Sequence, residues 1–107
     1  MAGGEVKNLT PEEVAQGLHA GSIMIVDVRE PREIEMERIP GSVFLPMSMF
    51  DPDSIPDPRG KTVVFSCASG IRSVTASQLA QAAGLPYDRH LAGGLKAWKA
   101  AGFPVEQ

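Results

Sequence analysis

The stretch TVVFSCASGIRS, residues 62–73, decides the fold of this chain. Residues 62–66 centre on an apolar run without alternation, which predicts a strand covered on both faces, as in a parallel sheet. A loop containing Gly70 follows at once. Beyond the loop, apolar residues at i, i+3, i+4 and i+7 predict a packed helix whose inward residues are Ala76, Leu79, Ala80 and Ala83. The stretch therefore predicts a strand, a short loop and a helix in succession.

The segments before this stretch repeat the alternation of helix and strand. Residues 10–13, Thr-Pro-Glu-Glu, are typical of a helix start, because threonine caps, proline suits the first position and glutamate completes a capping box. We expect that helix to end at Gly21. Residues 23–28 are a second continuous apolar run and predict a second buried strand. A short acidic helix is expected from Pro31 to about Glu37.

The remaining segments are shorter. Residues 47–59 contain three prolines, so we expect a loop with at most one helical turn. Brief strands are expected at residues 43–45 and 87–91, and a last helix at 95–101, with Leu95 and Trp98 facing inward. Strands that alternate with helices predict an α/β fold with an open parallel sheet of about five strands and helices on both faces. We expect a single domain over residues 1–107, with its core at about 5–105.

Composition limits the classes of protein that the chain can belong to. Its 107 residues suit one domain, and 43% hydrophobic with 21% charged residues is a globular balance. No segment reaches the length of about 18 apolar residues that spans a bilayer, so no membrane partner is expected. A net charge of −3 argues against a nucleic-acid partner. The start of the chain lacks a basic region followed by an apolar one, which predicts a cytoplasmic location.

The single cysteine, Cys67, is the main candidate for chemistry. A lone cysteine is commonly a small buried hydrophobe, and that structural interpretation stays open. Its position favours another one, because the loop N–H groups of residues 68–73 and the helix start can form an anion cradle that lowers a thiol pKa. Ligands of open parallel sheets bind beyond the carboxyl ends of the strands. Asp27 and Arg29 follow the other buried strand and are expected on the same rim.

Four motifs, in order, resemble those of the rhodanese family and cover nearly the whole chain. CASGIRS at residues 67–73 resembles the family's Cys-x-x-Gly-x-Arg-Ser active-site loop. DVREP at 27–31 resembles its Asp-Val-Arg-Glu motif, and IPGS at 39–42 resembles its Ile-Pro-Gly-Ala segment. LAGGLKAW at 91–98, followed by AGFPV at 101–105, resembles its C-terminal segment. The resemblance implies a single rhodanese-like domain.

The same resemblance implies a sulfurtransferase that needs no cofactor and no metal. Cys67 would be the catalytic nucleophile and would carry the transferred sulfur as a persulfide. The substrate-binding residues would be Ala68, Ser69, Gly70, Ile71, Arg72 and Ser73. Asp27 and Arg29 would support the rim. The expected partners are a small anionic sulfur donor, such as thiosulfate, and a cyanide or thiol acceptor, including the thiol of a redox protein.

Two alternatives to a self-sufficient sulfurtransferase are kept. Related phosphatases and arsenate reductases have a loop one residue longer, whereas Arg72 follows Cys67 by five positions, the sulfurtransferase spacing. A persulfide carrier docked to a partner protein is the second alternative. Ala68 and Ser69 are neutral where strong thiosulfate users often have basic residues, and Arg38 replaces a common histidine. His19 and His90 show no metal or catalytic spacing, so no role is predicted for them.

Overall fold

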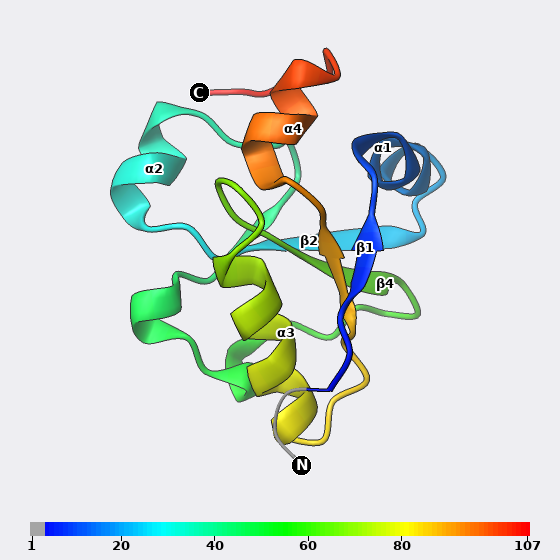
Figure 1. Cartoon of the computed structure of the whole chain (residues 1–107), viewed down its shortest axis with the longest axis vertical. Helices are drawn as coiled ribbons and strands as arrows, with labels where there is room; N and C mark the ends of the chain where they lie inside the picture. Colours follow the sequence, from blue (N-terminus) through cyan, green and yellow to red (C-terminus); the bar gives the residue numbers. More distant parts are fainter. Residues whose placement is uncertain (1–3) are drawn as a thin grey trace.

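The computed structural model describes residues 4–107, so the first three residues of the predicted domain lie outside the described range. Strands and helices alternate along the chain (Figure 1). The strands are β1 (Lys7–Leu9), β2 (Ile23–Asp27), β3 (Val43–Phe44), β4 (Thr62–Ser66) and β5 (Arg89–Leu91). The α-helices are α1 (Pro11–His19), α2 (Pro31–Met36), α3 (Arg72–Ala82) and α4 (Gly94–Ala100). None of the described helices is long and apolar enough to cross a membrane.

The five strands form one parallel sheet in the order β1-β5-β4-β2-β3. The longest pairing joins β2 to β4, with Ile23 opposite Thr62 and Asp27 opposite Ser66. Strand β4 is thus central, and the residues that follow it emerge between the ends of β2 and β5. The prediction of an α/β fold with a parallel sheet of about five strands is confirmed.

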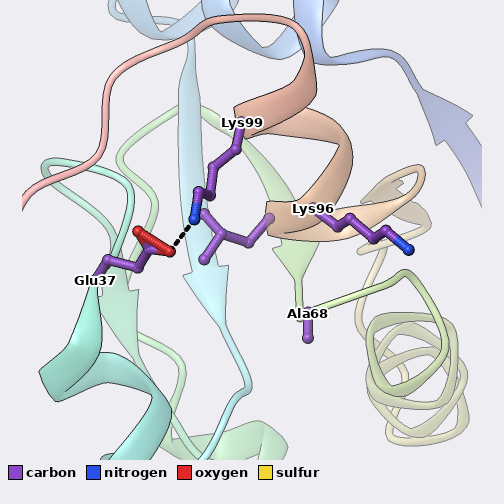
Figure 2. A pocket seen from close by; sticks show the side chains of 5 residues that line it. Glu37, Ala68, Lys96 and Lys99 are labelled. Atoms are coloured by element: carbon purple, nitrogen blue, oxygen red, sulfur yellow. Dashed lines mark hydrogen bonds and ion pairs between the residues drawn. The ribbon is translucent and has the colours of Figure 1, made fainter.

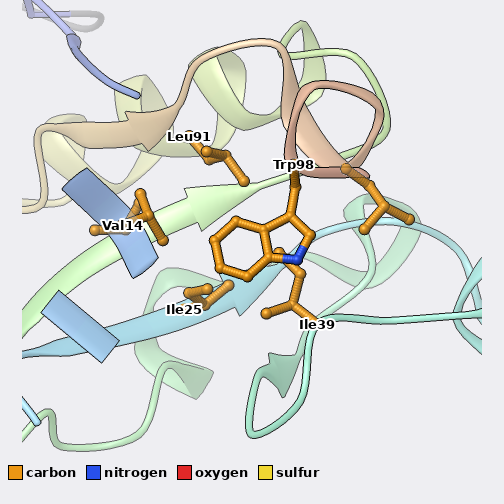
Figure 3. Packing of buried hydrophobic residues seen from close by; sticks show 7 residues of the cluster. Val14, Ile25, Ile39, Leu91 and Trp98 are labelled. Atoms are coloured by element: carbon orange, nitrogen blue, oxygen red, sulfur yellow. The ribbon is translucent and has the colours of Figure 1, made fainter. Parts of the chain in front are cut away.

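Helices cover both faces of the sheet, as predicted, because neighbouring residues of each central strand point to opposite sides. One face packs under α1 and α4, and Figure 3 shows Trp98 there among Val14, Ile25, Ile39 and Leu91. The indole Nε1–H of Trp98 donates to the Pro104 carbonyl at 2.8 Å. The other face packs under α3, with a buried set formed by Val26, Val28, Val63, Phe65, Cys67, Ala76 and Ala80.

The helix starts follow the predicted chemistry. At α1, the Thr10 hydroxyl accepts from the Glu13 N–H at 3.1 Å, and the Glu13 carboxylate accepts from the Thr10 N–H at 2.9 Å. Helix α2 begins with Pro31, and the Glu33 carboxylate accepts the Glu30 N–H at 2.9 Å. Local residue choice therefore fixes where both helices begin.

Two expectations are corrected, and one strand was not predicted. Residues 47–59 contain two short 3₁₀ helices, Met47–Met49 and Pro52–Ser54, because a proline at the start of each has the φ that a helical turn needs. The sequence of β1 lacks an apolar run that would predict a strand, and β1 forms by pairing with β5. Leu79 is 45% exposed and Ala83 is also exposed. The buried face of α3 is instead rotated onto Ser73, Ala76, Ser77 and Ala80.

Candidate active site

The candidate site lies at the carboxyl end of the sheet, where the rim residues meet as predicted. Cys67 directly follows β4, and Asp27 is the last residue of β2. The carboxyl ends of β2 and β4 are joined by a hydrogen bond, in which the Val28 N–H donates to the Ser66 carbonyl at 2.8 Å. The CASGIRS loop and the DVREP motif are therefore adjacent.

Three polar groups, two backbone N–H donors and one hydroxyl, converge on the sulfur of Cys67. The Gly70 N–H donates to Sγ at 3.1 Å and the Ser73 N–H at 3.4 Å. The Ser73 hydroxyl lies 3.4 Å from the same sulfur. Gly70 has a φ of +93°, a conformation that glycine adopts without strain. The loop thus wraps its N–H groups around a sulfur whose residue is only 1% exposed.

The thiol pKa reflects two opposed effects. Burial raises the pKa of Cys67, because the thiolate loses water. The Ser73 hydroxyl and the backbone N–H groups of Ser73, Gly70 and Ser69 lower it, since each can donate to the anion. The donors outweigh burial, and the pKa of Cys67 lies below its ordinary value of 9.0. The arrangement favours a thiolate, which is the nucleophilic form of cysteine.

The start of α4 holds the cysteine loop from behind. The Leu95 N–H donates to the Cys67 carbonyl at 2.8 Å, and the Lys96 N–H donates to the Ala68 carbonyl at 3.0 Å. This contact needs a residue without a side chain, because a Cβ on Gly94 would stand 2.4 Å from the Cys67 carbonyl oxygen. The Gly-Gly pair at 93–94 therefore fixes the loop carbonyls outward, which leaves the N–H groups to face the sulfur.

Asp27 and Arg29 form a buried ion pair that supports the rim. The Arg29 guanidinium donates to both Asp27 carboxylate oxygens at 2.9–3.1 Å, and both residues are 3% exposed. The same guanidinium also donates to the Glu37 carbonyl at 2.8 Å and reaches the Glu33 carbonyl at 3.4 Å. Arg29 thereby ties the end of α2 to the end of β2. Within residues 4–107, no hydrogen bond or ion pair joins either side chain to Cys67.

The side chain of Arg72 is occupied by a partner that the sequence did not reveal. Its guanidinium makes two parallel bonds to the Glu33 carboxylate, at 2.7 and 2.9 Å. Hydrogen bonding to Arg72 is the main reason that the pKa of Glu33 falls to about 2. Arg72 therefore anchors the start of α3 to α2, while its backbone belongs to the predicted cradle.

The other predicted loop residues surround the mouth of the site. Ala68 and Gly70 are half-buried, whereas Ser69 and Ile71 are exposed. Ala68 also borders a pocket of about 290 Å³, whose other lining residues are Glu37, Leu95, Lys96 and Lys99 (Figure 2). The Lys99 ammonium pairs with the Glu37 carboxylate across this pocket. Cys67 is not among the lining residues, since the loop covers its sulfur.

His90 is the residue at this site that sequence reasoning missed. Its Nδ1 lies 2.9 Å from the Ser73 hydroxyl, and its Nε2 lies 2.6 Å from the Asn8 side-chain oxygen. Burial lowers the pKa of His90 below its ordinary value. The only available signal was its place in a strand next to the predicted cysteine strand, because the contact is between residues far apart in sequence. Within residues 4–107, no group of three or more His, Cys, Asp or Glu side chains could hold a metal.

The fold and site define an α/β domain with a cysteine held in a strand–loop–helix cradle. Comparison with known proteins agrees: the "Rhodanese-like domain" family matches residues 10–101. A sulfurtransferase of Allochromatium vinosum is 32% identical over 101 residues, with 94% of each chain covered. This chain belongs to the rhodanese family. The family and this relative support a sulfurtransferase role.

Two further comparisons place the chain among larger proteins. An uncharacterised Synechocystis protein is 41% identical over 107 residues, covering 98% of this chain and 60% of that protein. The solved structure of a thiosulfate sulfurtransferase from Pseudomonas aeruginosa superposes with a TM-score of 0.82 at 31% identity. That match covers 95% of this chain and 20% of the Pseudomonas chain. The chain thus spans less than two thirds of the length of both proteins.

Proposed function

We propose that this chain moves a sulfane sulfur from a small anionic donor, such as thiosulfate, to a cyanide or thiol acceptor through a persulfide on Cys67. One observation carries the proposal: two backbone N–H groups and one hydroxyl converge on a single buried sulfur. Such an arrangement stabilises an anionic sulfur in a place where water does not compete. A buried cysteine with only a packing role has no need of three polar neighbours.

In the first step, the Cys67 thiolate attacks the outer sulfur of thiosulfate. A sulfur–sulfur bond forms to Sγ, the bond between the two donor sulfurs breaks, and sulfite leaves with the electron pair. The product is Cys67–S–S⁻. The N–H groups of residues 68–72 line the loop and are suited to hold this terminal anion, in the manner of a backbone nest.

In the second step, cyanide or a thiolate attacks the terminal sulfur of the persulfide. The new bond forms to the acceptor, the sulfur–sulfur bond to Cys67 breaks, and the Cys67 thiolate is regenerated. Thiocyanate or a low-molecular-weight persulfide leaves. The cycle uses one cysteine twice, and its charge stays on sulfur throughout.

Recognition of the anionic donor is assigned to Lys96. Arg72 is engaged by Glu33, and Lys99 is engaged by Glu37. Lys96 is exposed beside the pocket that Ala68 borders, and no carboxylate within residues 4–107 lies within 4 Å of its ammonium. An unpaired cation at the mouth raises the local concentration of a dianion such as thiosulfate.

Intact mass under non-reducing conditions tests the proposal. Incubation with excess thiosulfate is expected to add one sulfur atom to the chain, and cyanide is expected to remove it. Cys67→Ser is the matched variant, because it keeps the size and polarity of the side chain and removes the nucleophile. Full sulfur transfer by Cys67→Ser would show that the nucleophile is misassigned.

The same assay separates the remaining alternatives. A persulfide that forms only when a protein persulfide is the donor, and that small molecules remove slowly, would indicate a docked carrier. Hydrolysis of a phosphate ester by the wild-type chain, lost in Cys67→Ser, would indicate a phosphatase. The spacing of Cys67 and Arg72 disfavours the latter, since the loop of those enzymes is one residue longer.

A further inference from the structure

A continuous chain of hydrogen bonds leads from the cysteine to the edge of the sheet. It runs from Cys67 Sγ to the Ser73 hydroxyl, from there to His90 Nδ1, and from His90 Nε2 to the Asn8 side chain. These hydrogen bonds connect α3, β5 and β1 with the cysteine loop. Ser73 and His90 are buried, whereas Asn8 is exposed.

The Asn8 side chain, at the far end of this row of hydrogen bonds, fixes which group donates in each of them. The Asn8 atom that faces His90 is the carbonyl oxygen, which can only accept, so Nε2 of His90 carries a hydrogen. A neutral imidazole with a hydrogen on Nε2 has a bare Nδ1, which must accept from the Ser73 hydroxyl. The Ser73 oxygen is then free to accept from the Cys67 thiol. Within this hydrogen-bonded chain, the thiol, the hydroxyl and the imidazole N–H therefore all donate in the direction away from the sulfur.

We propose that Ser73, His90 and Asn8 form a proton relay that takes the thiol proton of Cys67 and so prepares the thiolate from inside the protein. The inference rests on the proposed function only in that Cys67 reacts as a thiolate. His90 acts through Ser73 and is a positioning residue that also accepts a proton. It does not touch the sulfur.

The proton movement balances without any other reactant. The S–H bond of Cys67 breaks as its proton passes to Ser73 Oγ, and the original hydroxyl proton of Ser73 passes to His90 Nδ1. Cys67 gains one negative charge and His90 one positive charge. The hydrogen on Nε2 stays on the bond to Asn8, and Ser73 now donates to the thiolate. The serine is unchanged by the transfer.

The surroundings of His90 leave the thiolate as its natural counter-ion. The charged side chains on β1, β5 and α3 are already paired, Lys7 and Arg89 with Asp88, and Arg72 with Glu33. On β4, the residue opposite His90 is the apolar Phe65. Both hydrogen-bond partners of the ring are uncharged, and burial lowers the pKa of His90, so the surroundings favour the neutral ring while Cys67 is a thiol.

The rate of alkylation of Cys67 by iodoacetamide, measured against pH, tests the relay without any sulfur transfer. A thiolate that is paired with the imidazolium reacts at pH values below the pKa of the thiol alone. The wild-type profile of alkylation rate against pH is therefore expected to show two inflections. His90→Asn can accept from Ser73 but cannot bind a proton, and Ser73→Ala cuts the chain. Both variants are expected to show one inflection and a rate about tenfold lower at pH 6, equal to about one unit of thiol pKa.

The matched control is His19→Asn, which removes the other histidine of the chain, an exposed residue at the end of α1. It is expected to keep the wild-type profile. The double variant of Ser73 and His90 is expected to be no slower than either single variant, since each breaks the same chain. Coincident profiles for wild type and His90→Asn would overturn the relay.

A measurement that leaves Ser73 and His90 unaltered covers the case in which a variant of either residue does not fold. The imidazole ¹⁵N spectrum is expected to show neutral His90 with its hydrogen on Nε2, and a higher His90 pKa in wild type than in Cys67→Ser. A hydrogen on Nδ1, or equal pKa values, would overturn the relay. Persulfide formation with unchanged alkylation profiles would reject the relay alone, whereas two inflections without persulfide formation would reject the proposed function alone.

Discussion

Replacing Gly94 by alanine is expected to detach the cysteine loop from α4. The new Cβ would stand 2.4 Å from the Cys67 carbonyl oxygen and 2.7 Å from the Ala68 carbonyl carbon, so one backbone must move. Gly94 also has a φ of +60°, where a side chain costs about 1 kcal/mol. Displacement breaks the bonds from Leu95 and Lys96 to the loop carbonyls, each worth about 1 kcal/mol.

These contributions sum to a loss of about 4–6 kcal/mol once overpacking, which costs about 1–3 kcal/mol, is included. Urea unfolding followed by tryptophan fluorescence measures the free energy, since Trp98 is the single tryptophan and lies in α4. Alkylation of Cys67 measures the loop separately. Its rate at neutral pH is expected to fall by about tenfold, because the N–H groups that lower the thiol pKa no longer converge on the sulfur.

Gly21→Ala is the matched control for backbone strain. Gly21 also has a positive φ, of +72°, but no atom lies within 4 Å of the position of a new Cβ. Its cost is expected to be only about 1 kcal/mol, with no change in alkylation. Equal destabilisation by the two substitutions, or an unchanged alkylation rate in Gly94→Ala, would refute the anchoring role of Gly94.

Three other substitutions test the side chains around the loop. Arg29→Ala leaves the buried Asp27 carboxylate unpaired and is expected to cost about 3–5 kcal/mol in urea unfolding; a loss below about 1 kcal/mol would contradict the bracing role. Glu33→Gln is expected to cost about 1 kcal/mol at pH 6, because solvent screens this half-exposed pair with Arg72. The Arg72 bond lowers the pKa of Glu33 from 4.5 to about 2, so its contribution is present above pH 4.5 and is lost as the pH falls toward 2. A difference from wild type that stays constant over that range would contradict the assignment. Lys96→Glu is expected to lower kcat/KM for thiosulfate about tenfold at low salt and less at high salt. Lys61→Glu, on the loop before β4, is its control, and equal effects would remove Lys96 from donor recognition.

The histidine relay and the Gly94 anchor act on opposite sides of the same loop. The first turn of α4 holds the carbonyls of Cys67 and Ala68, while Ser73 contacts the sulfur itself and is in turn bonded to His90. A loop that is fixed on both sides keeps its N–H groups in place before the sulfur-donating substrate binds. Such preorganisation is the usual source of electrostatic stabilisation in an active site.

The two central strands, the starts of α1 and α2 and the place of Cys67 after a strand could be predicted from local sequence. Local chemistry is sufficient for each of them. The runs at 23–27 and 62–66 are apolar enough to be buried on both faces, the Thr10–Glu13 box caps α1 without tertiary help, and the loop after β4 is contiguous with its strand. The family motifs, read as a resemblance, were also sufficient for the parallel α/β fold.

The hydrogen-bond partners of the polar side chains depend on the tertiary structure and could not be predicted from the sequence. Arg72 meets Glu33 across 39 positions, and His90 meets Asn8 across 82, so no local pattern could indicate either bond. Leu79 looked like a core residue because apolar spacing on a helix made of small residues is ambiguous. The sheet settled the choice by accepting Ser73, Ala76, Ser77 and Ala80, whose short side chains let α3 approach closely. Burial and long-range pairing depend on which surfaces meet, and that is fixed only when the chain folds.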